Sequence, residues 1–298
     1  LSLGERVSIV DNFDDGYDVT LKRRNIEASL EQAACRLYEC DIRDAAALDA
    51  AWCREPVDVV IHLAARSDVR ASVKNPTLYA DVNVNGTVNV LEAARKRGCG
   101  RFIHASSSSV YGNNPKRPFH EDDAVDNPRS PYAATKRAGE LLCCTYHRLY
   151  DLPMTCLRIF TAYGPRCRPD MAIARFTRLI DENKPVPMFG DADTRRDFTY
   201  VGDIVDGVIQ SIEPCGAFRI FNLGASKPVT VRHAISTIAE VLGKEPLIER
   251  HASHGADASI TYADINRSRN ELGFNPTTDF REGIGQYVRW YQDTYAVA

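Results

Sequence analysis

The stretch Arg101–Lys136 constrains the fold and the chemistry of this 298-residue chain more than any other. It begins with Arg101–Ala105, which has the character of a buried strand because Phe102 and Ile103 are apolar, and four serines follow directly. In an open α/β sheet, ligands bind beyond the carboxyl ends of the strands. The pattern therefore predicts a strand that delivers Ser106–Ser109 to a binding site.

Tyr132 and Lys136 stand four residues apart at the end of this stretch. If Pro131 begins a helix, both side chains lie on one face, about one turn apart. A tyrosine titrates near pH ~10, and a neighbouring cation such as Lys136 lowers that pKa. Together with a serine such as Ser107, the pair can move a proton on or off an alcohol. An ordinary helix with a solvated lysine is the alternative, and the serine strand upstream favours proton transfer.

Composition narrows the classes of function. Hydrophobic residues make up 44% and charged residues 26% of the chain, which is typical of a globular protein. A net charge of −3 does not suggest a nucleic-acid partner, and no apolar run reaches the ~18 residues of a membrane span. The nine cysteines include no Cys-x-x-Cys pair, so we expect reduced thiols in a cytoplasmic enzyme. We expect no metal, because His251 and His254 have no cysteine or carboxylate at ligand spacing.

Two further predicted strands end at an acidic residue. Asp11 follows Arg6–Val10, and Asp41 follows Leu37–Cys40. The carboxylate of Asp11 can accept hydrogen bonds from ribose hydroxyls and would repel a 2′-phosphate, which favours NAD over NADP. An aspartate that only starts a turn is the alternative for Asp11. The absence of a glycine-rich turn ahead of this strand in the sequence favours this alternative.

In a dinucleotide-binding fold, a strand, a glycine-rich turn and a helix come before this point. From a βαβ unit of ~30 residues, we expect that about 25 residues are missing ahead of Arg6. Since this turn cradles the pyrophosphate of the cofactor, cofactor binding and activity of the chain as given are left open.

As an ordered set, the motifs resemble the extended short-chain dehydrogenase/reductase family, in its nucleotide-sugar epimerase branch. The segments that carry this resemblance are VDNFDDGYD, CDIRD, VVIHLAA, NVNGTVNVLEAA, ASSSSVYG, PYAATK, LRIFTAYGPRCRPDMA, RRDFTYVGDIVDGV and FNLG. They are most similar to those of UDP-glucuronate and UDP-glucose 4-epimerases. The resemblance implies a Rossmann-type doubly wound parallel α/β sheet, without its first βα unit, over residues 1–166. It also implies a smaller, mainly substrate-binding lobe over residues 167–298, with some later segments returning to the first domain.

The resemblance also assigns roles to individual residues. The residues implied to be catalytic are Ser107, Tyr132 and Lys136. Those implied to bind NAD are Asp11, Asn12, Phe13, Asp41, Ile42, Leu63, Ala64, Ala65, Tyr132, Lys136 and Phe160. Those implied to bind a UDP-sugar are Ser107, Ser108, Thr161, Arg168 and Arg196. Arginine suits a diphosphate because its guanidinium binds such groups bidentately. The second diphosphate contact, near residues 251–257, stays unassigned.

The implied reaction is epimerisation at C4 of a UDP-hexose through a 4-keto intermediate, with Tyr132 removing the proton of the 4-hydroxyl. Thr161 favours glucuronate over glucose, because glucose-type relatives often have asparagine there. A 4,6-dehydratase or decarboxylase would usually have an acid after the serine strand, and Ser106–Val110 contains none. A dehydrogenase that releases its cofactor and a non-catalytic sugar-nucleotide-binding remnant are further alternatives. A homodimer packed through the Tyr132 helix and the Tyr79–Arg97 helix is implied by the resemblance alone.

Overall fold

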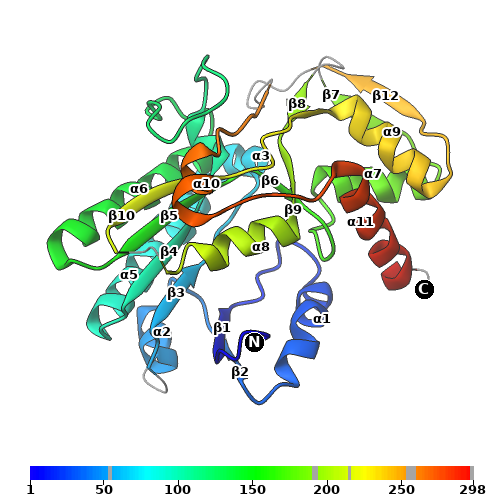
Figure 1. The fold of residues 1–298 in the computed structure, drawn as a ribbon. Coiled ribbons are helices and arrows are strands. Elements are labelled where there is room, and N and C mark those ends of the chain that lie inside the picture. The colour runs from blue at the N-terminus through cyan, green and yellow to red at the C-terminus, as the bar shows by residue number, and fades with distance from the viewer. Residues whose placement is uncertain (53–55, 190–193, 214–215, 253–259, 296–298) are drawn as a thin grey trace.

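The computed structural model describes residues 1–52, 56–189, 194–213, 216–252 and 260–295. At its centre is a parallel sheet in the order β10–β5–β4–β3 (Figure 1). The strands are β3 (Val59–His62), β4 (Arg101–Ser107), β5 (Met154–Ile159) and β10 (Phe218–Leu223). Helices α5 (Gly86–Lys96) and α6 (Pro131–Tyr150) cover one face, and α8 (Val201–Gln210) and α10 (Asn266–Leu272) cover the other (Figure 1). The predicted doubly wound α/β fold is confirmed.

The remaining strands and helices complete the two ends of the molecule. In chain order they are β1 (Val7–Asp11), α1 (Val19–Leu30), β2 (Cys35–Glu39), α2 (Ala45–Trp52), α3 (Val69–Lys74), α4 (Pro76–Ala80), η1 (Asp81–Asn85), η2 (Ser108–Tyr111), β6 (Thr161–Tyr163), α7 (Ala172–Asp181), β7 (Val186–Phe189), β8 (Arg195–Arg196), β9 (Phe198–Tyr200), β11 (Val229–Thr230), α9 (Val231–Leu242), β12 (Ile248–His251) and α11 (Phe280–Tyr295). None of the helices in these described ranges is both long and apolar enough to cross a membrane.

Strands β1 and β2 form a separate parallel pair, in which Asp11 lies opposite Glu39. Neither of them is hydrogen-bonded to β3 within the described residues. An apolar cluster links this pair to the main sheet instead, since Ile42 and Leu48 pack in one core with residues of α5 and β4. The two strands therefore keep their place through helix packing rather than through a continuous ladder.

The predicted strand at Arg101–Ala105 is present and extends two residues further. Its ladder with β5 continues to the pairs Ser106–Arg158 and Ser107–Ile159. Phe102 and Ile103 are fully buried, as their apolar character predicted. The longer ladder matters for the site, because it gives the first two serines the fixed backbone of a sheet.

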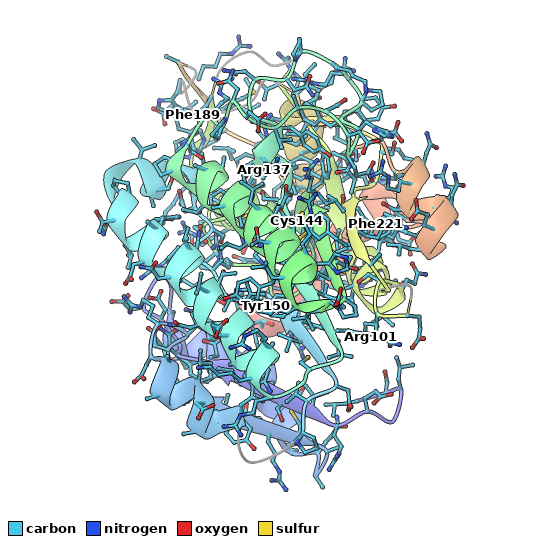
Figure 2. The ribbon with its side chains drawn as sticks, turned by 90° about the vertical axis from the view of Figure 1, so that its left-hand side faces the viewer. Arg101, Arg137, Cys144, Tyr150, Phe189 and Phe221 are labelled. Atoms are coloured by element: carbon cyan, nitrogen blue, oxygen red, sulfur yellow. The ribbon has the colours of Figure 1, made fainter. Side chains whose placement is uncertain are left out.

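Helix α6 begins where the sequence predicted. Pro131 occupies its first turn, and the Ser130 hydroxyl caps it by accepting a hydrogen bond from the Ala133 backbone N–H at 3.1 Å. Proline suits this position because its missing N–H would have no partner in the helix. The helix ends at Asp151, which has a positive φ of 52°. In Figure 2 the helix runs diagonally across one face of the molecule, from near Arg137 to Tyr150.

The continuous helix expected over Tyr79–Arg97 is instead divided by a π-helical turn, η1. Asn83 in this turn donates from its side-chain amide to the Thr135 hydroxyl at 3.0 Å and to the Arg66 carbonyl at 2.9 Å. Its side-chain oxygen accepts from the Arg66 N–H at 2.8 Å. The wider turn thereby binds the segment after β3 to helix α6, in line with the frequent occurrence of π-turns near functional sites.

The C-terminal part contains its own apolar core, formed by α7, α9 and α11 with β7 and β9. The helix predicted at Val229–Leu242 begins two residues later, because Val229 and Thr230 pair with β8 as strand β11. The predicted helix Arg281–Thr294 corresponds to α11. Strand β10 and helix α10 return to the main sheet (Figure 1), so later segments complete the first domain.

Candidate active site

Ser107, Tyr132 and Lys136 meet where β4 ends against the first turns of α6. The Tyr132 phenol faces Ser107, and the Lys136 ammonium donates to the Ala105 carbonyl at 2.7 Å. Ser107 Oγ also accepts from the Ser109 backbone N–H at 3.2 Å. Both Tyr132 and Lys136 are buried. The structure thus brings together the three groups that the sequence predicted for proton transfer.

The electrostatics of this centre differ in one respect from the sequence-based expectation. Burial raises the pKa of Tyr132, and the hydrogen bond with Ser107 and the charge of Arg168 oppose this rise. The cation that lowers the pKa of Tyr132 is therefore Arg168, because the Lys136 ammonium is directed at the Ala105 carbonyl. Burial also lowers the pKa of Lys136, to about 8.

Tyr79 packs edge-on against Tyr132, with ring centroids 6.4 Å apart and an interplanar angle of 83°. Its phenol oxygen accepts a hydrogen bond from the Asp68 backbone N–H at 3.1 Å. Edge-to-face packing of this kind fixes the orientation of a ring. No local pattern signals this contact, because Tyr79 is 53 residues away from Tyr132 along the chain.

A cavity of about 1960 Å³ opens beside these three groups. The predicted site residues that line it are Leu63, Ala65, Ser107, Ser108, Tyr132, Lys136, Phe160, Thr161, Arg168 and Arg196. The predicted residues outside its lining are Asp11, Asn12, Phe13, Asp41, Ile42 and Ala64. The first set collects residues of the acid–base centre and of the implied sugar-nucleotide site in one space.

The other predicted cofactor residues gather at the ends of β1 and β2. The Asp11 carboxylate accepts a hydrogen bond from the Phe13 N–H at 2.7 Å. Asn12 donates from its side chain to Asp41 at 2.8 Å. Side-chain hydrogen bonding to Arg43 lowers the pKa of Asp41 to about 2, although burial opposes this. The structure therefore leaves Asp11 as the exposed carboxylate that can accept from a ligand hydroxyl.

The predicted cofactor residues have properties that suit both the adenosine end and the nicotinamide end of NAD. Leu63 is 60% exposed and Ala64 is exposed at the carboxyl end of β3, and the small alanines there leave the backbone open to a ligand. Asp11 suits the ribose hydroxyls. Phe160 is buried in the cavity wall, where it offers a flat apolar surface beside Tyr132.

The cavity is strongly cationic. Its described cations are Lys136, Arg70, Arg129, Arg166, Arg168, Arg175, Arg178 and Arg196. The carboxylates among its described lining residues are Asp68, which caps α3, and Asp170, which pairs with Arg168 at 2.9 Å. Arg168 also donates to the Ser67 hydroxyl. Such an excess of arginine suits a diphosphate, which guanidinium groups bind bidentately.

One wall of this cavity is made by the stacked side chains of Arg70, Phe189 and His251, and the sequence patterns did not predict it. The Arg70 guanidinium lies 4.5 Å from the centre of the Phe189 ring. The His251 ring stacks on Phe189 with centroids 5.1 Å apart. His251 belongs to strand β12 rather than to a loop, and His254 lies outside the described residues. The three side chains come from α3, β7 and β12, so no local pattern could reveal the wall.

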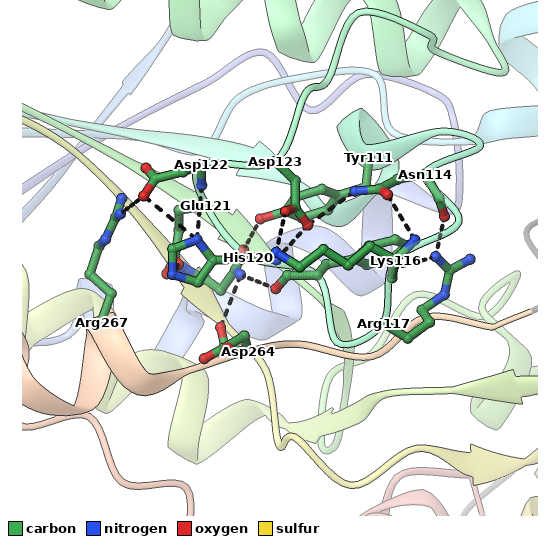
Figure 3. A network of polar contacts seen from close by, with 12 residues as sticks. Tyr111, Asn114, Lys116, Arg117, His120, Glu121, Asp122, Asp123, Asp264 and Arg267 are labelled. Carbon is green, nitrogen blue, oxygen red and sulfur yellow. Dashed lines mark hydrogen bonds and ion pairs between the residues drawn. The ribbon is translucent and has the colours of Figure 1, made fainter.

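The polar insert between the serine strand and α6 also contributes to the site. Phe119 is almost fully buried and stacks on Tyr111, with ring centroids 4.5 Å apart, and it lies 6.5 Å from Phe160. Ion pairs of the same insert include Arg267–Asp122 at 2.6 Å (Figure 3). The insert is therefore anchored to the cavity wall by an aromatic contact that its overall polarity concealed.

The described residues contain no group of three or more His, Cys, Asp or Glu side chains that could hold a metal ion. The two carboxylates of the cavity lining are already hydrogen-bonded to protein groups.

Comparisons with known proteins agree with this geometry. Residues 8–224 match the model of the NAD dependent epimerase/dehydratase family. The UDP-glucuronate 4-epimerase of Thermodesulfobacterium geofontis is 43% identical over 295 residues, which cover 98% of this chain and 90% of the relative. The UDP-glucuronic acid 4-epimerase of Bacillus cereus, solved with UDP-glucuronic acid and NAD, has a TM-score of 0.92 at 33% identity, covering 97% of this chain and 92% of that one.

A dTDP-glucose 4,6-dehydratase, DesIV of Streptomyces venezuelae, solved with NAD and TYD, has a TM-score of 0.91 at 27% identity, covering 98% of this chain and 89% of that one. Backbone similarity alone therefore does not separate the two reaction types, and the residues of the site must do so. Both the family model and these relatives agree with the predicted resemblance, and the chain belongs to the NAD dependent epimerase/dehydratase family.

Proposed function

We propose that this protein is an NAD-dependent 4-epimerase whose substrate is UDP-glucuronate. The observation that carries the proposal is the convergence of Ser107, Tyr132 and Lys136 beside a cavity lined with arginines. A proton-transfer unit next to a site for a diphosphate matches a reaction on an alcohol of a nucleotide sugar. The names of the relatives, which are UDP-glucuronate 4-epimerases, supply the sugar.

In this mechanism Tyr132 takes the proton from the 4-hydroxyl and later returns one to the same oxygen. Ser107 holds that oxygen through a hydrogen bond, and the charge of Arg168 favours the phenolate. Lys136, bonded to the Ala105 carbonyl, holds the first turns of α6 on β4. Bound NAD supplies a reversible hydride acceptor. Its nicotinamide would lie beside Phe160, and its adenosine ribose would bind Asp11. The residues proposed for the rest of the cofactor are Asn12, Phe13, Asp41, Ile42, Leu63, Ala64 and Ala65.

Substrate binding is proposed to use Ser108, Thr161, Arg168 and Arg196. Arg168 and Thr161 both line the cavity, and the charge of Arg168 acts on Tyr132, so a carboxylate at C5 of the sugar would find donors there. Arg196 suits the diphosphate. The division into a cofactor domain, residues 1–166, and a mainly substrate-binding lobe, residues 167–298, follows this distribution of roles.

A dehydratase is the second candidate, because DesIV has nearly the same backbone. Elimination of water needs an acid near the sugar. Within the described lining, the two carboxylates are occupied by the α3 backbone and by Arg168. Glu121 in the insert is buried, accepts a hydrogen bond from the Asn222 N–H at 2.9 Å and is not part of the cavity lining. The site therefore favours epimerisation.

The direct test is to incubate the purified protein with NAD and UDP-glucuronate and to follow the sugar by proton NMR. We expect UDP-galacturonate with retention of the carboxylate, and Tyr132→Phe should slow its formation by about 10²–10⁴-fold. A 4-keto-6-deoxy product from dTDP-glucose or UDP-glucose would instead support the dehydratase. Folded protein that binds neither NAD nor any UDP-sugar would support the non-catalytic remnant.

We also propose a homodimer packed through α5 and α6. Leu141, Leu149 and Tyr150 on α6 are 52%, 65% and 47% exposed, and the two helices lie side by side on this face (Figure 2). Light scattering after size exclusion would test it, with Leu149→Glu expected to give monomers. A cytoplasmic location fits the seven described cysteines, none of which is in a disulfide.

A further inference from the structure

A row of buried polar side chains crosses the main sheet directly beneath the acid–base centre. Ser106 on β4 pairs with Arg158 on β5, which pairs with Asn222 on β10. All three are buried, and Arg158 is only 1% exposed. Because a buried charge without partners is costly, the partners of Arg158 must have been built into the fold.

The main partner is Glu140 on α6, whose side chain is fully buried. Its carboxylate accepts from the Ser106 hydroxyl at 2.6 Å and from two nitrogens of Arg158 at 2.8 and 2.9 Å. Arg137 donates to it at 3.0 Å from the half-buried side. Although burial raises the pKa of Glu140, hydrogen bonds and charge from Arg158 together with the Ser106 hydrogen bond hold it below its usual value. The carboxylate is thus ionised and fully coordinated.

Glu140 lies on the same face of α6 as the acid–base residues. Tyr132, Lys136 and Glu140 follow one another at intervals of four, which places them in one line along the helix. Each faces the end of β4: Tyr132 faces Ser107, Lys136 donates to the Ala105 carbonyl, and Glu140 accepts from the Ser106 hydroxyl. Through Arg158, Glu140 alone of these three also holds the neighbouring strand β5.

We propose that Glu140 is a positioning residue, which together with Ser106 and Arg158 fixes helix α6 on the end of β4 and so sets the distances from Ser107 to Tyr132 and to Lys136. This inference rests on the proposed acid–base role of Tyr132. Arg158 is itself held from the other side, because it donates to the Glu121 carbonyl at 3.0 Å and lies 4.8 Å from the Tyr111 ring. The helix is therefore fixed against two strands rather than one.

Two histidines and two thiols face the Lys136 ammonium. His62 on β3 and His104 on β4 face it, and burial keeps the pKa of both histidines well below the ordinary value, so they are neutral. The thiols of Cys143 and Cys156 also face it, from α6 and β5.

Around Tyr132 the facing groups are Tyr79, Ser107 and Arg168. A shift of α6 on β4 would move the phenol relative to Ser107 and Arg168. The stabilisation of the phenolate would fall, and the titration of Tyr132 would move to higher pH.

The experiment uses Ser106→Ala, which removes the 2.6 Å bond to Glu140 and leaves the Arg158–Glu140 pair intact. We expect kcat for UDP-glucuronate to fall about 10-fold, since small misplacements of reacting groups cost this much or more, with KM changed less than about 2-fold. We also expect the pH profile of kcat to move to higher pH. The ultraviolet difference titration of Tyr132, taken against Tyr132→Phe in the same background, should move in the same direction.

The matched control is Ser211→Ala. Ser211 is also fully buried and donates one hydrogen bond, to the Val208 carbonyl at 2.7 Å, but it lies at the end of α8 away from the cavity. It should leave kcat and the Tyr132 titration unchanged. Identical titrations for wild type and Ser106→Ala, with activity lost only in proportion to unfolded protein, would overturn the positioning role.

Glu140→Gln provides a second variant, because it keeps an acceptor for Ser106 but turns an amide toward Arg158. It should shift the Tyr132 titration further than Ser106→Ala does, and a titration equal to that of wild type would count against the proposal. The titration needs no sugar. A shifted titration in protein that turns over no UDP-sugar would therefore support the positioning role while removing the proposed reaction.

Discussion

The acid–base centre and the arginine-lined part of the cavity are built in opposite ways. Tyr132 and Lys136 are buried, project from one helix and face the end of one strand. Arg168 and Arg196 stand on a loop and a short edge strand and stay partly exposed. Proton transfer requires positions fixed to a fraction of an ångström, whereas a diphosphate can be held by guanidinium groups that adjust to it. The acid–base groups are therefore held rigidly, whereas the arginines proposed to bind the diphosphate can adjust to it.

The largest expected effect tests the buried side of this comparison. Tyr132→Phe removes the only group placed to exchange a proton with the 4-hydroxyl in the proposed mechanism. We expect kcat to fall by about 10²–10⁴-fold, the range for a positioned acid or base, with little change in the affinity for UDP-glucuronate. Calorimetry and NMR turnover on the same preparation would measure both. Turnover near that of wild type would remove Tyr132 from the acid–base role.

The buried side should also make stability depend on pH. Burial lowers the pKa of His62 from 6.5 to about 3 in the folded protein. The unfolded chain therefore binds a proton below pH 6.5 that the folded chain refuses, and stability is lost as pH falls through this range. At pH 5 the loss from one such histidine is about 2 kcal/mol. Urea unfolding at pH 6.5 and pH 5 should show a smaller pH dependence for His62→Gln than for wild type.

His104 is buried beside His62, and burial lowers its pKa as well. The His62→Gln variant should therefore still lose some stability as pH falls. An equal loss of stability in wild type and His62→Gln would mean that this imidazole is protonated in the folded protein as easily as in the unfolded one.

Arg196→Ala tests the exposed side. Its guanidinium lines the cavity and donates to the Arg195 carbonyl at 2.9 Å. Loss of one charge-assisted contact to a diphosphate should weaken UDP-glucuronate binding about 10-fold, with a smaller change in kcat and in the urea midpoint. Lys184→Ala is the control, because Lys184 is an exposed cation that pairs with Glu182 outside the cavity lining. Unchanged UDP affinity by calorimetry would take Arg196 out of the site.

The smallest expected effect is that of salt, which distinguishes the exposed arginines from the buried acid–base groups without a mutation. Salt screens exposed charges over about 10 Å at 0.1 M and over about 3 Å at 1 M. Raising the salt concentration should therefore increase KM for UDP-glucuronate several-fold through the arginines, while kcat, set by buried groups, changes little. A parallel fall in kcat would show that the buried centre is not insulated from solvent as the structure indicates.

The amount that could be predicted follows the same division. The strand at Arg101, the helix at Pro131 and the convergence of Ser107 with Tyr132 all come from local patterns and from the rule that ligands lie at the carboxyl ends of strands. Glu140 and Arg158 were missed, although one signal existed. Arg158 is a charge within the apolar strand segment TCLRIF, and an arginine there needs a buried partner.

The sequence by itself determined the main elements, their order and the residues proposed to carry the chemistry, because helix caps, apolar runs and strand-end serines act over a few residues. Only the tertiary structure decided which partners these residues have. It directed Lys136 to the Ala105 carbonyl, bound Glu140 to Ser106 and Arg158, and built a wall from Arg70, Phe189 and His251. These contacts join segments up to about 180 residues apart. Their geometry depends on how the layers pack, which no local pattern encodes.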